Sequence, residues 1–146
     1  MFRKIMQRIV PADKMIEMFT FRIISNKSIE EIVQKIPEAC AANGFSLLQT
    51  YVYHDIVESK GFPIKRKVFI YEICRAKTAA SMLTDFPHFS IFMPCKLSVY
   101  EQDNKTVIST MDMEVMLKAV KSNKELFLEA NTLFNTLKSM KNQLSD

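Results

Sequence analysis

Apolar and polar residues begin to alternate at Met18, and this is the first regular pattern along the chain. A period of two is typical of a half-buried β-strand, so we expect the first core strand to start here. Its apolar side is formed by Phe19, Phe21 and Ile23. Residues 1–17 are basic and rich in Met. We interpret them as an N-terminal extension, with a short helix before Pro11, ahead of one α+β domain over residues 18–146.

A helix is predicted from Ser28. The segment Ser28-Ile29-Glu30-Glu31 matches a capping box, in which the first hydroxyl and the fourth carboxylate satisfy the free N–H groups at a helix start. Apolar residues then recur at the spacing of one helix face. Pro37 removes a hydrogen bond from the helix interior, so a kink or early fraying is expected there. Gly44 is expected to close the helix in a left-handed conformation.

Two more helices are predicted further along the chain. An Ala-rich helix begins near Ala76 and ends at Phe86-Pro87. The last helix is expected to open with a second capping box at Ser122 and to continue to Leu144. Its apolar stripe comprises Leu126, Ala130, Leu133, Leu137, Met140 and Leu144. Packing of this stripe on the chain's own sheet is the favoured interpretation, and a dimer seam is the alternative.

Four further strands are indicated by alternating segments, at residues 45–54, 67–74, 91–101 and 107–113. In the first of them, Leu47 and Tyr51 are expected on the same side. Residues 55–63 are expected to form a loop or a single turn. The polar residues 102–105 are expected to join the last two strands as a hairpin.

Strands in adjacent pairs with helices between them favour an α+β fold with a largely antiparallel sheet of about five strands, in the order β-α-β-β-α-β-β-α. A doubly wound parallel sheet is the alternative. It is disfavoured because the chain holds two glycines, too few for a dinucleotide-binding loop or a P-loop.

Composition places the chain among ordinary globular proteins. Its 146 residues are 48% hydrophobic and 25% charged, which excludes collagen-like, low-complexity and disordered classes. No apolar run approaches the ~18 residues of a membrane span. The three cysteines are an odd number, so reduced thiols are expected rather than a disulfide framework. We therefore expect a soluble, cytoplasmic protein, although an export signal ahead of Met1 would escape this reasoning.

The net charge of +4 is too small to indicate a nucleic-acid or membrane partner by itself. Basic residues nevertheless gather between positions 60 and 77, with Lys65, Arg66 and Lys67 in sequence. The favoured interpretation is a solvated surface. Nucleic-acid binding through this basic surface is a second alternative for function, and membrane binding is not expected.

Two segments, Glu72–Ala79 and Met93–Glu101, resemble the two signature segments of the domain of unknown function 302 family, small proteins mainly from bacteria and archaea. The resemblance covers roughly residues 18–113. The family often has Asn-Pro after its first cysteine, where this chain has Arg75-Ala76. The resemblance implies a single copy of a fold like that of the TATA-box-binding protein, and it implies homodimers. It supplies no activity, because none is known for the family.

Cys74 and Cys95 are the sharpest candidates for chemistry. By strand alternation Cys74 lies in phase with Glu72 and Cys95 with Glu101, so each sulfur is expected to share a sheet face with a carboxylate. That arrangement suits a thiol redox pair or a soft metal site. However, neither C-x-x-C nor H-E-x-x-H occurs in the sequence, and buried cysteines most often act as small apolar residues.

The polarity of their loops is the favoured explanation of both histidines, His54 and His88; of the two, His88, among aromatic residues, is the better candidate to touch a ligand. Ten methionines raise the possibility of copper or haem, but core packing explains them better and no C-x-x-C-H haem site occurs. No metal or cofactor is therefore predicted. We expect a homodimeric binding or interaction module with an unknown small-molecule or protein ligand, more plausibly not an enzyme; thiol redox or metal binding through Cys74 and Cys95 is the first alternative.

Overall fold

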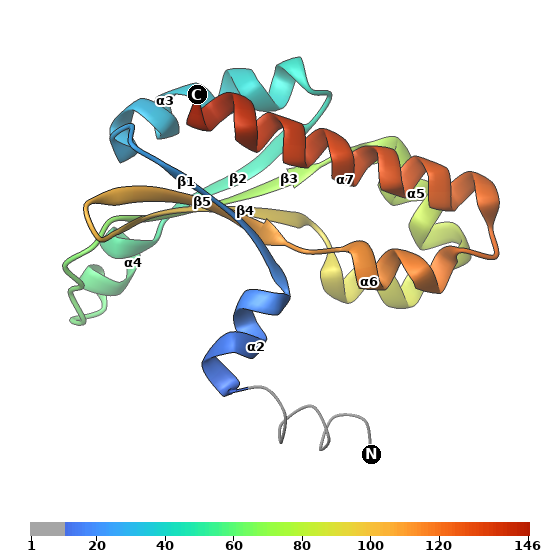
Figure 1. The fold of residues 1–146 in the computed structure, drawn as a ribbon, viewed down its shortest axis with the longest axis horizontal. Helices are drawn as coiled ribbons and strands as arrows, with labels where there is room; N and C mark the ends of the chain where they lie inside the picture. The colour runs from blue at the N-terminus through green and yellow to red at the C-terminus, as the bar shows by residue number, and fades with distance from the viewer. Residues whose placement is uncertain (1–10) are drawn as a thin grey trace.

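A computed structural model describes residues 11–146 and shows one five-stranded sheet in which every neighbouring pair is antiparallel. The strand order is β1-β5-β4-β3-β2 (Figure 1). The strands are β1 Thr20–Ser25, β2 Ser46–Val52, β3 Val68–Cys74, β4 Cys95–Gln102 and β5 Lys105–Met111. This sheet confirms the expected α+β fold.

The helices connect and cover these strands. They are α2 Ala12–Met18, α3 Ile29–Ala42, α4 Tyr53–Ser59, α5 Ala76–Asp85, α6 Glu114–Leu117 and α7 Lys124–Ser145, with two short 3₁₀ helices, η1 Pro87–Phe92 and η2 Lys118–Val120. The helices α3 and α7 lie side by side over the same face of the sheet (Figure 1). Within residues 11–146, no helix combines the length and the apolar character needed to cross a membrane.

The main core lies between the sheet and the pair α3 and α7. Ile32 and Ile36 of α3 and Leu97 and Val99 of β4 are completely buried there. The C-terminal half of α7 closes this core with Leu137, Met140 and Leu144. The C-terminal half of the stripe therefore packs on the chain's own sheet, as the favoured interpretation held, whereas Leu126 and Ala130 belong to a second apolar cluster.

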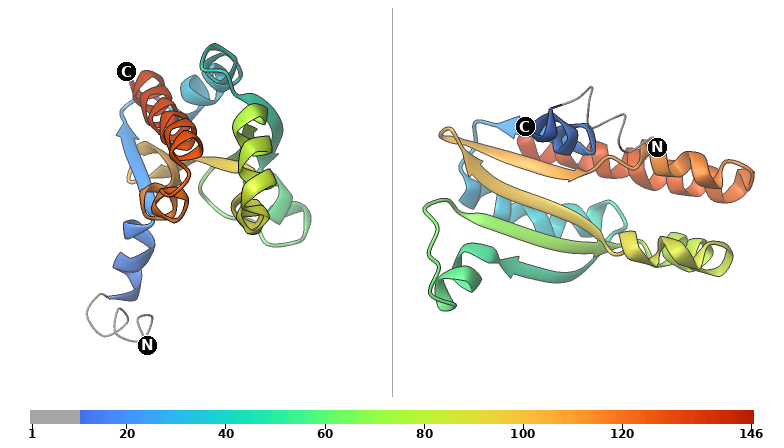
Figure 2. Two further views of the ribbon diagram at one scale, coloured as in Figure 1. Left: turned by 90° about the vertical axis from the view of Figure 1, so that its right-hand side faces the viewer. Right: turned by 90° about the horizontal axis from the view of Figure 1, so that it is seen from below.

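A second apolar cluster lies beyond the end of the sheet. Met82 of α5, Phe89 of η1 and Leu117 of α6 pack there against Leu126 and Phe134 from the N-terminal half of α7. In the right-hand view of Figure 2, the α5–η1 segment and α7 both extend past the ends of the strands. The long α7 thus takes part in both clusters.

The first predicted helix agrees with the sequence analysis at both ends. The N–H of Glu31 donates to Ser28 Oγ at 3.3 Å, and the N–H of Ser28 donates to Glu31 Oε2 at 2.9 Å, which completes the capping box. Gly44 follows the C-cap with a φ of 75°, a conformation that side chains disfavour. The helix continues through Pro37 to Ala42, so the fraying expected at the proline is not seen.

Two strand starts were predicted too early. The first strand begins at Thr20 rather than Met18, because α2 extends through Met18. The N-terminal extension therefore contains a helix after Pro11, which was not predicted. The helix that was predicted before Pro11 lies outside the described residues. The fourth strand begins at Cys95 rather than Ile91, because residues 87–92 form the 3₁₀ helix η1 and Pro94 has no N–H to donate to a ladder.

The second strand also departs from its predicted pattern. It ends at Val52, and the helix α4 replaces the expected loop. A bulge between Leu47 and Gln49 inserts one extra residue into the pairing with β3, where Leu47 pairs with Ile73 and Tyr51 with Ile70. Leu47 and Tyr51 therefore lie on opposite faces, because a one-residue shift reverses the side to which later residues point.

Two boundaries near the C-terminus differ by one or two residues. The last strand begins at Lys105, after a tight turn in which Asp103 and Asn104 have φ values of 51° and 59°. The last helix is capped by Asn123 rather than Ser122: the N–H of Leu126 donates to Asn123 Oδ1 at 3.1 Å. The amide group of Asn123 also donates to Asp85 Oδ2 at 3.0 Å, and this hydrogen bond links the start of α7 to the end of α5.

Candidate functional site

An apolar cavity of about 320 Å³ lies between the two core clusters, and we call it the α5–α7 cavity. Its floor is formed by the end of β3 and the start of β4, with Ile73, Cys74 and Cys95. Its walls come from α5, from the η1 segment, from the residues around α6 and from α7. The lining side chains from these walls include Ala79, Met82, Phe89, Phe92, Met113, Leu117, Leu133 and Phe134. The volume is near the lower end of the ~300–1,000 Å³ typical of small-molecule sites.

Two leucines mark where the cavity meets the surface. Leu48 of β2 is 54% exposed and Leu83 of α5 is 40% exposed, and both belong to the lining. Leu48 lies at the bulge of β2, where the side of the sheet to which successive residues point is reversed. Large apolar side chains at an opening provide an apolar route from solvent to the interior.

Cys74 and Cys95 both line the α5–α7 cavity, so the structure brings the two predicted cysteines to one place. They come from neighbouring strands, and Cys95 pairs directly with Ile73. All three cysteines are free thiols. Burial, and next to it the neighbouring Cys74, raises the pKa of the Cys95 thiol. This favours the protonated thiol over the nucleophilic thiolate.

Arg75 ties the start of α5 to the end of α3. Its Nη2 donates to the carbonyl oxygen of Asn43 at 2.7 Å, and its guanidinium lies 4.8 Å from the centre of the Phe45 ring. Among the described residues that line the cavity, Arg75 carries the one formal charge. No acidic side chain within residues 11–146 forms an ion pair with it.

The remaining predicted site residues lie elsewhere. Glu72 pairs across the ladder with Lys96 and Gln49, and its carboxylate, by hydrogen bonding to the Tyr51 phenol, raises the pKa of that phenol. Glu101 lies six residues along β4 from Cys95, about 20 Å away at ~3.3 Å per residue. Each sulfur shares a sheet face with its carboxylate, as strand alternation predicted, but Glu72 and Glu101 do not line the α5–α7 cavity.

His88 also lies outside the cavity lining. It is exposed on η1 and stacks against Phe86 and Phe89, with ring centres 5.8 and 5.2 Å apart. Its neighbours Phe89 and Phe92 do line the cavity. The predicted residue, His88, is therefore not one that reaches the cavity.

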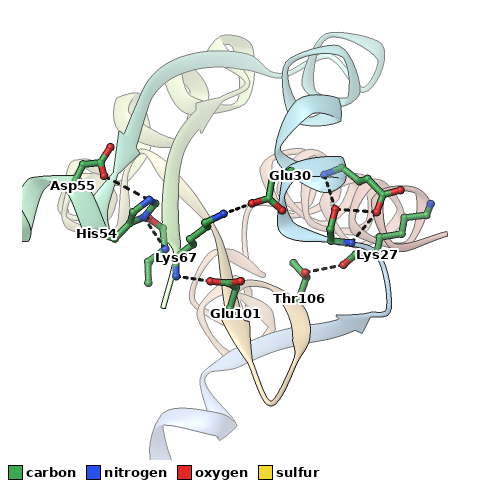
Figure 3. A network of polar contacts seen from close by, with 10 residues as sticks. Lys27, Glu30, His54, Asp55, Lys67, Glu101 and Thr106 are labelled. Atoms are coloured by element: carbon green, nitrogen blue, oxygen red, sulfur yellow. Dashed lines mark hydrogen bonds and ion pairs between the residues drawn. The ribbon is translucent and has the colours of Figure 1, made fainter. Parts of the chain in front are cut away.

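The predicted basic surface lies at the opposite end of the sheet, where Figure 3 shows a network of polar contacts. Lys67 forms an ion pair with Glu30, and its N–H donates to Glu101 Oε1 at 2.7 Å. His54 Nδ1 accepts from the N–H of Val68 at 3.0 Å.

Lys65 and Arg66 border a broad polar depression of about 740 Å³ at this end. Its charged lining residues are four basic and three acidic: Lys27, Lys65, Arg66, Lys105, Glu30, Glu101 and Asp103. A surface of mixed sign lacks the uniform positive field that attracts a polyanion.

The described residues offer few groupings of side chains that could bind a metal ion. Across the described residues, no group of three or more His, Cys, Asp or Glu side chains is arranged to hold a metal ion. The two cysteines of the cavity stand without a third ligand of these types.

The comparisons with known proteins agree with the geometry of the fold. The sequence profile of the family described as "Domain of unknown function DUF302" matches residues 21–144. The chain belongs to this family. A crystal structure of an uncharacterized conserved DUF302 protein from Bacillus stearothermophilus is similar, with a TM-score of 0.70 and 22% identity over 83% of this chain and 97% of that one. No curated protein matches the chain.

The segments that carried the DUF302 resemblance frame the α5–α7 cavity. Glu72–Ala79 contains the end of β3 and the start of α5, and Met93–Glu101 contains the start of β4. Sequence reasoning found Cys74 and Cys95 in them but missed Thr78, Ala79 and Met82, which line the cavity from α5. The spacing of these three on one helix face, with a threonine among apolar residues, is the signal that could have identified them.

Proposed function

We propose that this DUF302 protein binds a small, largely apolar molecule in the α5–α7 cavity. The observation that carries the proposal is the cavity itself, about 320 Å³ with a predominantly apolar lining and exposed leucines at its opening. Each CH₂ group moved from water into such surroundings stabilises a complex by ~0.8 kcal/mol. A ligand with one chain or one or two rings fits this volume class.

The two cavity cysteines serve this proposal as part of the lining. Their thiols are soft and only weakly polar, so they pack with Ile73 and Met82 as apolar surface. The raised pKa of the Cys95 thiol argues against a thiolate mechanism for this residue. Binding is therefore favoured over thiol or metal chemistry.

The test uses a fluorescent, uncharged probe with two fused rings, 6-propionyl-2-dimethylaminonaphthalene, and a pair of matched variants. Ala79→Met places a long side chain in the cavity, whereas Ala80→Met adds the same side chain at the next position of α5, exposed and outside the lining. We expect the wild type and Ala80→Met to bind the probe with similar affinity and Ala79→Met to bind at least about tenfold more weakly. Equal binding by all three proteins, each folded by circular dichroism, would contradict the proposal.

We also propose that the chain forms a homodimer through the sheet face opposite α3 and α7. The pairing register places Ile24, Tyr100 and Val68 in one row across this face, together with Val107, which is already buried in the single chain. Ile24 is 69% exposed, and Met111, on the same face, is 42% exposed. A second copy of the chain would remove this apolar surface from water.

Light scattering after size-exclusion chromatography tests the assembly separately. We expect a dimer for the wild type and for Leu128→Lys, because Leu128 is 66% exposed on α7, the helix that covers the opposite face of the sheet. Ile24→Lys should shift the protein to a monomer, since it buries an unpaired charge in the interface. A monomeric wild type, or a dimer unaffected by Ile24→Lys, would overturn this assembly.

A further inference from the structure

The N-terminal end of α5 lies against the α5–α7 cavity. The helix has 10 residues, and Arg75 at its N-cap provides no side-chain acceptor for the first N–H groups. Such groups have no partner within the helix and give the end a partial positive charge. Cys74, Arg75, Thr78 and Ala79, which surround this end, all belong to the cavity lining.

Thr78 supplies a second, independent observation. Its side chain is 4% exposed, and its Oγ1 has no hydrogen-bond partner among the described residues. The other hydroxyls of α5 bond back to the helix: Ser81 Oγ donates to the carbonyl oxygen of Lys77 at 3.1 Å, and Thr84 Oγ1 donates to that of Ala80 at 2.7 Å. A buried hydroxyl without a partner is destabilising, so Thr78 indicates that a polar ligand atom belongs at this point of the cavity.

The charge of the lining indicates the sign of that ligand atom. No acidic residue in the described part of the chain lines the cavity, and Arg75, whose guanidinium is held by the carbonyl oxygen of Asn43 and the Phe45 ring, is the one charged residue of the lining. The helix end adds to the positive potential. An anionic head group is favoured at this end, and a cationic one is disfavoured.

We propose that the cavity takes a medium-chain carboxylate, with its carboxylate at the start of α5 and its chain among the apolar walls. This rests on the proposed function and names the ligand class. The Thr78 hydroxyl donates to one carboxylate oxygen, and the free N–H groups of the first turn stabilise the anion. The chain extends along Met82, Phe89 and Phe134. The volume of about 320 Å³ suits one aliphatic chain.

Isothermal titration of the full chain with three ligands of one chain length tests the head group. Decanoate, decan-1-ol and decyltrimethylammonium share their apolar part. We expect decanoate to bind at least about tenfold more tightly than the alcohol, because hydrogen bonds to charged groups are the stronger ones, and the cation to bind most weakly. Octanoate should bind more weakly than decanoate by about fourfold for each CH₂ removed.

A matched pair of threonine variants locates the head group. Thr78→Val removes the buried hydroxyl and keeps the branched shape, so decanoate affinity should fall about tenfold. Thr84→Val makes the same substitution in the same helix, at an exposed position outside the lining, and should leave affinity unchanged.

The outcomes separate the two proposals. Equal affinity for decanoate and decan-1-ol would overturn the carboxylate inference while leaving an apolar cavity, and tighter binding of the cation would do the same. Unchanged decanoate affinity in a folded Thr78→Val would also overturn it. No binding of any of the three ligands would refute the proposed function itself. The ligand series needs no variant, so it decides the matter even where Thr78→Val does not fold.

Discussion

Lys141 is a buried lysine whose effect on stability can be worked out from the structure. It is 0% exposed, its Nζ donates to the carbonyl oxygen of Phe21, and the same nitrogen lies 4.0 Å from the centre of the Phe21 ring. Burial above all, and then the positive charge of Lys138, lower the pKa of Lys141 to about 7. Asp112 acts in the opposite direction.

The sign and size of the effect follow from proton linkage. Between pH 7 and the ordinary lysine pKa near 10.5, the unfolded chain keeps the proton that the native protein has released. Stability therefore rises with pH across this window. One pKa unit corresponds to ~1.4 kcal/mol, so Lys141 should add roughly 3 kcal/mol to the free energy of unfolding between about pH 7 and about pH 10.

Urea unfolding followed by circular dichroism at these two pH values measures the gain. Lys141→Met removes the titrating group, and its gain should be smaller than that of the wild type by roughly 3 kcal/mol. Lys124→Met, an exposed position on the same helix, serves as the control and should behave like the wild type. If Lys141→Met and the wild type gain equally, the native protein does not hold this lysine neutral and the reasoning is refuted.

Three further predictions concern the elements that position the cavity, each measured by urea unfolding. Asn123→Ala should lower the free energy of unfolding by about 1 kcal/mol by removing the cap of α7, whereas Ser122→Ala should change it by less than half of that. The reverse order would show that Ser122, the residue predicted from sequence, is the cap. Gly44→Ala should cost about 1 kcal/mol from the backbone alone, because φ is 75° and an added Cβ meets nothing closer than 3.7 Å; no loss would contradict the left-handed conformation. Leu137→Ala should cost ~2–5 kcal/mol in the buried face of α7, and Leu128→Ala, 66% exposed, less than ~0.5; similar costs would show that α7 packs by another face.

Local signals in the sequence predicted most of the fold. The capping box at Ser28, the left-handed glycine at position 44 and the apolar stripe of the last helix depend on neighbours along the chain, and all three are confirmed. The errors arose where tertiary contacts decide the structure. Asn123, rather than Ser122, caps the last helix, and its amide group also donates a hydrogen bond to Asp85, a residue distant in the sequence that local signals could not indicate.

The site could be predicted only in part for the same reason. Cys74 and Cys95 stood out because their residue type and the family signature drew attention to them. Thr78 carries no motif, and its meaning depends on burial and on the absence of a partner among the described residues. Strand alternation placed Glu101 on the face of Cys95 but could not show that the two lie at opposite ends of β4 relative to the cavity.

The methionines offer the most direct test of binding in the α5–α7 cavity. Met82, Met93 and Met113 line it, Met140 is 0% exposed in the main core, and Met18 is 56% exposed on α2. With ¹³C-methyl-labelled methionine, addition of decanoate should shift the methyl signals of the three lining residues and leave those of Met140 and Met18 in place. Signals of Met82, Met93 and Met113 that stay unchanged at saturating decanoate would contradict the account.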